Sequence, residues 1–144
     1  MQTISTIDLA HRLRPVIARL ARRMRQHAGG DLSPTQGAAL NTIACHGPLT
    51  PSELAAREKI QRPTATRVLA RLEEAGLIAR AADPADRRSS LVAATEAGEA
   101  LLAGTRAEKD KYLAERLDRL SPEELVVLER AAGILERVLE EAAE

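Results

Sequence analysis

Apolar residues recur at helical spacing along most of the chain, which predicts a mainly helical protein. The predicted helices cover residues 6–27, 34–45, 51–57, 62–75, 96–119 and 122–142. The period changes at residues 77–80 and 90–93, which predict two short strands of a β-hairpin with a long polar tip. This order of elements is the outline of a winged helix-turn-helix with extra helices at both ends, so we expect a mainly α (α+β) fold.

The same spacing predicts which side chains are buried. In the helix at 62–75, one face carries Ala65, Val68, Leu69 and Leu72. In the helix at 34–45, the residues available for burial are Ala38, Leu40, Ile43 and Ala44. Helical residues that recur every three or four positions face the same neighbour, so we expect these two sets to form the core.

The last predicted helix carries an apolar stripe spaced alternately by three and four residues: Leu125, Leu128, Ala132, Leu135 and Leu139. On a strongly charged helix, this pattern suits a helical partner, most simply a second copy of the chain. We therefore expect this helix to lie at an interface between two copies of the chain.

Three of the helices begin with one shared local sequence, found at residues 33–36, 50–53 and 121–124. Each has a hydroxyl residue at the N-cap, Pro at the first helical position and Glu or Gln at the third. The hydroxyl and the Glu or Gln each accept a bond from a backbone N–H that the helix leaves without a partner, and this fixes the helix start. Thr95 is the predicted cap of the helix at 96–119. Pro15 predicts a bend or a late start in the first helix.

Composition narrows the range of functions. Aromatic residues make up 1% of the chain, so readers that stack bases on aromatic rings are excluded. One cysteine allows no internal disulfide and no cysteine-based zinc site, and His11, His27 and His46 have no partners at metal-ligand spacing. No phosphate loop, HExxH or nucleophile-elbow motif occurs, so we expect neither an enzyme nor a cofactor. Because no apolar run or leader pattern appears either, we expect a soluble cytoplasmic protein with no membrane partner.

The formal net charge is zero, but the charges are unevenly distributed. Residues 1–30 carry a net +5, residues 51–90 a net +2, and residues 91–144 a net −6. An acidic segment repels phosphate, so the middle segment is the better place for nucleic acid.

Residues 49–98 resemble the MarR family of bacterial transcription regulators in order and spacing. The matching segments are 49–67, 72–78, 83–88 and 91–98, and the flanking helices agree in length. The most specific segment is the hairpin tip with its Asp86-x-Arg88 pattern.

The resemblance implies an obligate homodimer that binds pseudo-palindromic double-stranded DNA and mostly represses transcription. It implies that residues 1–30 and 96–144 form a helical dimerisation region, which makes a single intertwined domain with the winged helix-turn-helix region at 31–95. Because the first helix then serves mainly the dimer, we expect the arginines of residues 1–30 to form a solvated helical face rather than a DNA contact. Many members of the family release DNA when a small phenolic or other lipophilic compound binds, so the resemblance implies such an effector. Other members respond to oxidation of a cysteine early in the first helix, where this chain has none.

The fourth predicted helix is the expected DNA reader, because its N-terminal turn would meet base edges in the major groove. The DNA-contacting residues we expect on it are Arg62, Thr64, Thr66, Arg67 and Arg71, with Gln61 at its cap. Arg62, Thr64 and Arg67 are the expected base readers, with Arg67 to guanine foremost. Gln61 is a poor cap, so either the start is loose or its amide is free for adenine or a phosphate. Thr50 and Ser52 are expected to donate to phosphate. The alternative is that Arg67 and Arg71 only pair with Glu73 and Glu74 on a solvated face.

In the hairpin tip, Asp86 and Arg88 occupy the Asp-x-Arg positions of the family, and the resemblance implies that Arg88 enters the minor groove. We expect the Asp86 carboxylate to hold the Arg88 guanidinium extended, so that less rotamer entropy is lost on entering a narrow A·T-rich groove. Arg87 is expected to take a phosphate or to share the insertion. The alternative is an ordinary exposed ion pair on a surface loop.

An effector pocket is expected where the first, second and fifth helices approach the winged region. Its predicted lining is Val16, Ile17, Leu20, Ile43, Leu101 and Leu102, with a polar contact from Arg19 or His11. Cys45 is predicted to be a small buried residue, and Tyr112 to pack in the core or the dimer interface.

Two functions are thus open. The first is a dimeric, sequence-specific DNA-binding repressor. The alternative is a dimeric winged-helix interaction module without specific DNA binding, since many folds share this topology.

Overall fold

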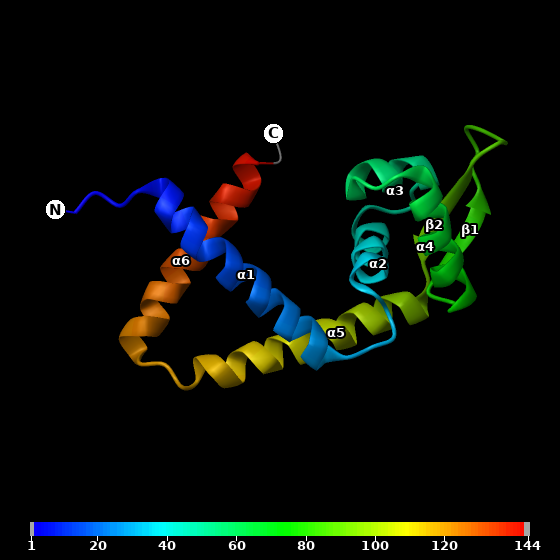
Figure 1. The fold of residues 1–144 in the computed structure, drawn as a ribbon. Helices are drawn as coiled ribbons and strands as arrows, with labels where there is room; N and C mark the ends of the chain where they lie inside the picture. The colour runs from blue at the N-terminus through cyan, green and yellow to red at the C-terminus, as the bar shows by residue number, and fades with distance from the viewer. Residues whose placement is uncertain (1, 143–144) are drawn as a thin grey trace. The chain divides into compact units, whose positions relative to one another are not determined.

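The computed structural model describes residues 2–142 and has the predicted order of helices and strands (Figure 1). The elements are α1 (Thr6–Ala28), α2 (Pro34–His46), α3 (Pro51–Glu58), α4 (Arg62–Glu74), β1 (Ile78–Ala82), β2 (Ser90–Ala94), α5 (Glu96–Leu117) and α6 (Pro122–Glu141). The mainly helical winged helix-turn-helix fold is confirmed. Within residues 2–142, no helix is both long and apolar enough to cross a bilayer.

All three predicted helix starts are confirmed. Ser33, Thr50 and Ser121 each accept a bond from the backbone N–H three residues later, and each receives the reciprocal bond through Gln or Glu at that position. The predicted late start at Pro15 is wrong, because α1 already begins at Thr6. The Ser5 hydroxyl caps α1 by accepting from the Asp8 N–H at 3.3 Å, so the helix is established before Pro15 is reached.

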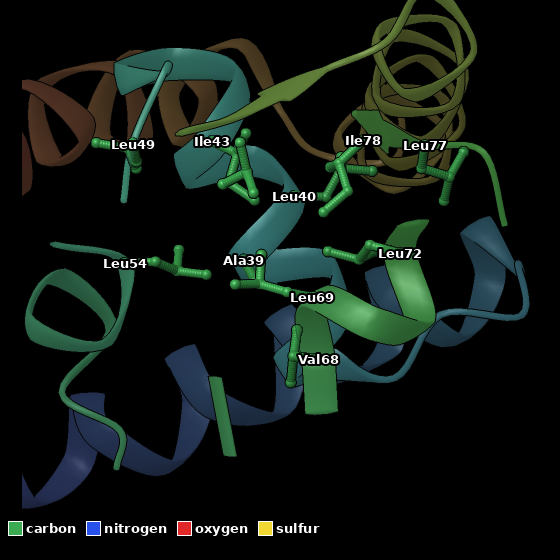
Figure 2. Packing of buried hydrophobic residues seen from close by; sticks show 11 residues of the cluster. Ala39, Leu40, Ile43, Leu49, Leu54, Val68, Leu69, Leu72, Leu77 and Ile78 are labelled. Atoms are coloured by element: carbon green, nitrogen blue, oxygen red, sulfur yellow. The ribbon is translucent and has the colours of Figure 1, made fainter. Parts of the chain in front are cut away.

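The core lies in the central region, where α2, α3, α4 and the hairpin meet (Figure 2). On α4, the predicted set is confirmed, since Ala65, Val68, Leu69 and Leu72 are all buried. On α2, the buried residues are Ala39, Leu40 and Ile43. The prediction of Ala38 is wrong, because Ala39 stands four residues before Ile43 and therefore shares its face, whereas Ala38 is turned outward.

The two strands form an antiparallel hairpin in which Ile78 pairs with Ala94, Arg80 with Val92, and Ala82 with Ser90. We call residues 78–94 the wing. Leu49, just before α3, exchanges two backbone bonds with Val92, at 3.0 and 2.7 Å. These bonds attach the base of the wing to the start of the helix-turn-helix.

Thr95 joins the end of α4 to the start of α5. Its hydroxyl donates to the Gly76 carbonyl at 2.6 Å and accepts from the Gly98 N–H at 3.1 Å. A Cβ atom at position 98 would overlap the Leu77 carbonyl oxygen, so the close approach of the two segments requires a glycine there.

The chain divides into two compact units, residues 1–109 and 110–144. In the first unit, α1 has no buried residue, and Val16, Ile17 and Leu20 on it are exposed. The second unit contains α6, whose apolar residues are likewise exposed: Leu125, Val126, Val127, Leu128, Ile134, Leu135, Val138 and Leu139. Each unit therefore presents an uncovered apolar helix face.

Candidate nucleic-acid interface

The exposed side of α4 carries the arginines. Because Ala65, Val68, Leu69 and Leu72 face the core, Arg62, Arg67 and Arg71 are left exposed together with Thr66, and Thr64 is half-buried. The Thr66 hydroxyl donates to the Arg62 carbonyl at 3.0 Å, so its proton is already used in a hydrogen bond within α4. Burial on one face of α4 thus determines which side chains the opposite face presents.

The start of α4 has no side-chain cap. Gln61 stands at the N-cap with extended backbone angles, but its amide makes no capping bond. The prediction of a poorly capped start is confirmed. The N–H groups of the first turn are therefore open to an outside acceptor such as a phosphate oxygen.

Arg62 connects α4 to α3. Its Nη1 donates to the Ser52 hydroxyl, which orients the first turn of α4 against the first turn of α3. A guanidinium has further N–H groups to offer a base or a phosphate. The Thr50 hydroxyl accepts from the Glu53 N–H at 3.1 Å, so its oxygen already serves the α3 cap.

The tip of the wing is organised by aspartates that bind the backbone. The Asp83 carboxylate accepts from the Ala85 N–H, and the Asp86 carboxylate accepts from the Arg88 N–H, both at 2.9 Å. Among the described residues, the Asp86 carboxylate makes no ion pair with the Arg88 guanidinium, so the expectation that it holds this group extended is wrong. A carboxylate two residues before an N–H closes a local turn more easily than it reaches a long side chain. Arg87 and Arg88 extend from this turn as exposed residues.

Two cavities flank α4. The first, of about 370 Å³, lies between α3, α4 and the wing, and its lining includes Ser52, Arg62, Thr66, Arg80, Asp86 and Arg88. The second, of about 530 Å³, lies against the start of α2, and its lining includes Ser33, Thr35, Gln36, Thr64, Arg67 and Arg71. The predicted DNA contacts thus gather into two sets along one helix. Thr50, Gln61 and Arg87 line neither cavity.

Arg80 is a residue of this interface that the sequence analysis did not single out. Its Nε donates to the Glu73 carboxylate at 2.6 Å, the one ion pair found in the described residues 2–142. Glu73 therefore pairs with the wing, and the alternative in which it pairs with Arg67 or Arg71 is wrong. The available signal was the alternation along β1, which puts Arg80 on the same face as buried Ile78.

A further cavity of about 680 Å³ lies between the end of α1, the start of α2 and α5. Leu101 and Leu102 line it as expected, but the other predicted lining residues do not. Ile43 belongs to the core, and Val16, Ile17, Leu20, His11 and Arg19 lie on exposed positions nearer the start of α1. The cavity is instead flanked by four cationic side chains: Arg22, Arg25, Arg106 and Lys109. Arg106 donates to the Asn41 side chain at 3.1 Å on its wall.

Cys45 is exposed, so the prediction of a buried cysteine is wrong. It lies two residues after buried Ile43, a rotation of about 200° that turns it away from the core. Tyr112 is 6% exposed, and the Arg116 guanidinium stacks 3.4 Å from the centre of its ring. Across the described residues, no group of three or more potential metal ligands comes together.

Comparisons with known proteins agree with this architecture. The MarR family model matches residues 32–90. An HTH-type transcriptional regulator of Mycobacterium tuberculosis is 36% identical to this chain over 96% of this chain and 97% of that protein. The structure of a MarR family protein from Bacillus stearothermophilus is similar with a TM-score of 0.80 and 27% identity, over 99% of this chain and 100% of that one. The crystal structure of a mutant MarR from E. coli gives a TM-score of 0.76 and 26% identity, over 96% and 99% of the two chains.

Proposed function

The chain belongs to the MarR family of transcriptional regulators, and on that premise we propose that it is a homodimeric repressor that binds a pseudo-palindromic operator. In this proposal α4 enters the major groove and the wing reaches the adjacent minor groove. The observation that carries it is the set of exposed arginines on one helix and one loop: Arg62, Arg67, Arg71, Arg87 and Arg88.

The uncovered apolar faces support the homodimer. Leu125, Leu128 and Leu135 on α6 are each at least 39% exposed in the single chain. Large apolar patches of this kind are covered in solution by a partner, and two identical faces satisfy one another through two-fold symmetry. A dimer also delivers two α4 helices to two half-sites of one duplex.

A titration separates specific DNA binding from the alternative of an interaction module. The probe is a short palindromic duplex from the region upstream of the protein's own gene, compared with a scrambled duplex of the same composition over a range of salt concentrations. We expect nanomolar binding to the palindrome, with an affinity that falls steeply as salt rises. Equal affinity for both duplexes would instead favour the interaction module.

Arg88→Ala is expected to weaken operator binding by about 5-fold to 20-fold, and chiefly where the flanking sequence is A·T-rich. The reason is that a narrow A·T minor groove has an enhanced negative electrostatic potential, which attracts an inserted guanidinium. The measurement is a comparison of A·T-rich and G·C-rich flanks by fluorescence anisotropy. Arg130→Ala on α6 removes the same charge outside the wing and is the matched control. An equal loss on both flanks would contradict insertion of Arg88.

We also propose that an anionic, lipophilic effector occupies the cavity between α1, α2 and α5. Four cations stand beside apolar Leu32, Leu101 and Leu102 there. Among the described residues, no carboxylate lines this cavity. The carboxylate of an organic acid would therefore pair with the cationic side chains without competition from a carboxylate of the protein. An effector bound here touches both α5 and α2, and α2 is part of the winged helix-turn-helix region.

Salicylate, an aromatic carboxylate, is expected to raise the Kd for the operator by about 5-fold to 150-fold at saturation. Benzyl alcohol, of similar shape and without charge, should have little effect because the cations would have nothing to neutralise. Arg25→Ala should weaken the salicylate response, whereas Arg23→Ala, two residues away on α1 and outside the cavity lining, should leave it intact. Equal responses of the two variants would contradict this site.

A further inference from the structure

Arg80 stands at the point where the apolar contact between the wing and the rest of the core ends. Arg80 is directly paired with Val92 and stands two residues after Ile78, so all three lie on one face of the hairpin. This is the face that packs toward the core. Ile78 is 2% exposed and Val92 is fully buried, whereas every residue of β1 beyond Ile78 is exposed. No apolar side chain of β1 beyond Ile78 therefore holds the outer half of the wing against α4.

The Arg80 guanidinium supplies that attachment. Its Nε donates to Glu73 on the last turn of α4 at 2.6 Å, and its Nη1 donates to the Ser90 hydroxyl on β2 at 3.4 Å. One planar group thus connects α4, β1 and β2. A lysine in the same place has no comparable fork of donors.

We propose that Glu73 and Arg80 are positioning residues that fix the wing against α4, and so set the span between the α4 arginines and Arg88. This inference rests on the proposed DNA-binding function. A protein that places one element in the major groove and another in the minor groove binds DNA more weakly when the distance between the two elements fluctuates. The reason is that the conformational freedom of the two elements is lost on binding, at a cost in entropy.

Arg80 also lines the cavity shared with Arg62 and Arg88, and the alternative role for it there is a direct contact with phosphate. The two roles predict opposite effects of Glu73→Gln. If Glu73 merely occupied a phosphate-binding arginine, its neutralisation would free Arg80 and tighten DNA binding. If the pair positions the wing, neutralisation weakens binding even though the protein becomes more positive.

The experiment compares full-length Glu73→Gln with Glu74→Gln, which removes the same charge from the next residue. The first measurement is amide hydrogen exchange of residues 78–94 in the free protein. The expected result is exchange about threefold to fivefold faster in Glu73→Gln than in Glu74→Gln, a size typical of one partly exposed ion pair. Equal exchange in the two variants would overturn the proposal. This measurement needs no DNA, so it decides the role of the pair even if the native protein fails to bind its operator.

The second measurement is operator affinity. Glu73→Gln and Arg80→Gln should each bind about threefold to fivefold more weakly than the native protein, and the double variant no more weakly than either one. Glu74→Gln should bind equally well or slightly better. Tighter binding by Glu73→Gln, or additive losses in the double variant, would overturn the proposal and assign Arg80 to phosphate.

Discussion

Replacement of Arg67 by Ala is expected to reduce the preference for the operator over a scrambled duplex by about 1–3 kcal/mol, the value of one bidentate contact between arginine and guanine. Arg67 is exposed on α4, and among the described residues no carboxylate pairs with it. Its guanidinium is therefore available to a base edge without breaking a contact within the protein. The measurement is a pair of titrations, one for each duplex, at the same salt concentration.

The control for Arg67→Ala is Arg57→Ala, which removes a positive charge from the exposed side of α3. The control should weaken binding to both duplexes by the same small factor, because a general loss of charge carries no sequence information. An Arg67→Ala variant that loses equal affinity for both duplexes would show that Arg67 contacts phosphate and that base recognition lies elsewhere.

Leu128→Glu on α6 is expected to separate the protomers. Leu128 is 44% exposed in the single chain and belongs to the apolar stripe of α6. A carboxylate buried without a partner costs several kcal/mol, and two-fold symmetry repeats it in both chains, so the dimer Kd should rise by about 100-fold or more. Sedimentation velocity at micromolar concentration measures the change, and operator binding should fall with it.

Arg130→Glu is the matched control, since it also introduces a glutamate on α6 but away from the stripe. It should sediment as the native protein does. Circular dichroism of both variants checks that the helices are retained. If Leu128→Glu sediments like the native protein across that concentration range, the α6 stripe does not form the interface.

Local sequence determined the parts of the fold that were predicted correctly. The capping boxes at Ser33, Thr50 and Ser121 involve residues three positions apart, so the sequence contains the whole interaction. The buried face of α4 follows from helical spacing alone. The uncapped start at Gln61 was predicted for the same reason, because capping chemistry belongs to the residue itself.

The predictions that were wrong concern contacts between segments distant in the sequence, or side chains with two possible hydrogen-bond partners. The ion pair of Glu73 with Arg80 depends on how β1 packs against α4, which spacing along the chain does not specify. The Asp86 carboxylate could bind either the backbone N–H or the guanidinium of Arg88, and in the structure it accepts from the backbone N–H. The cavity expected near the middle of α1 lies instead at the C-terminal end of that helix. Its position depends on where α1, α2 and α5 approach each other.

The Thr95 hydroxyl has a mechanical consequence. One oxygen atom bonds the end of the α4 segment on one side and the first turn of α5 on the other, and Gly98 brings the two backbones into contact beside it. A tilt of the first turn of α5 relative to the segment that follows α4 must therefore either break these bonds or move the two segments together.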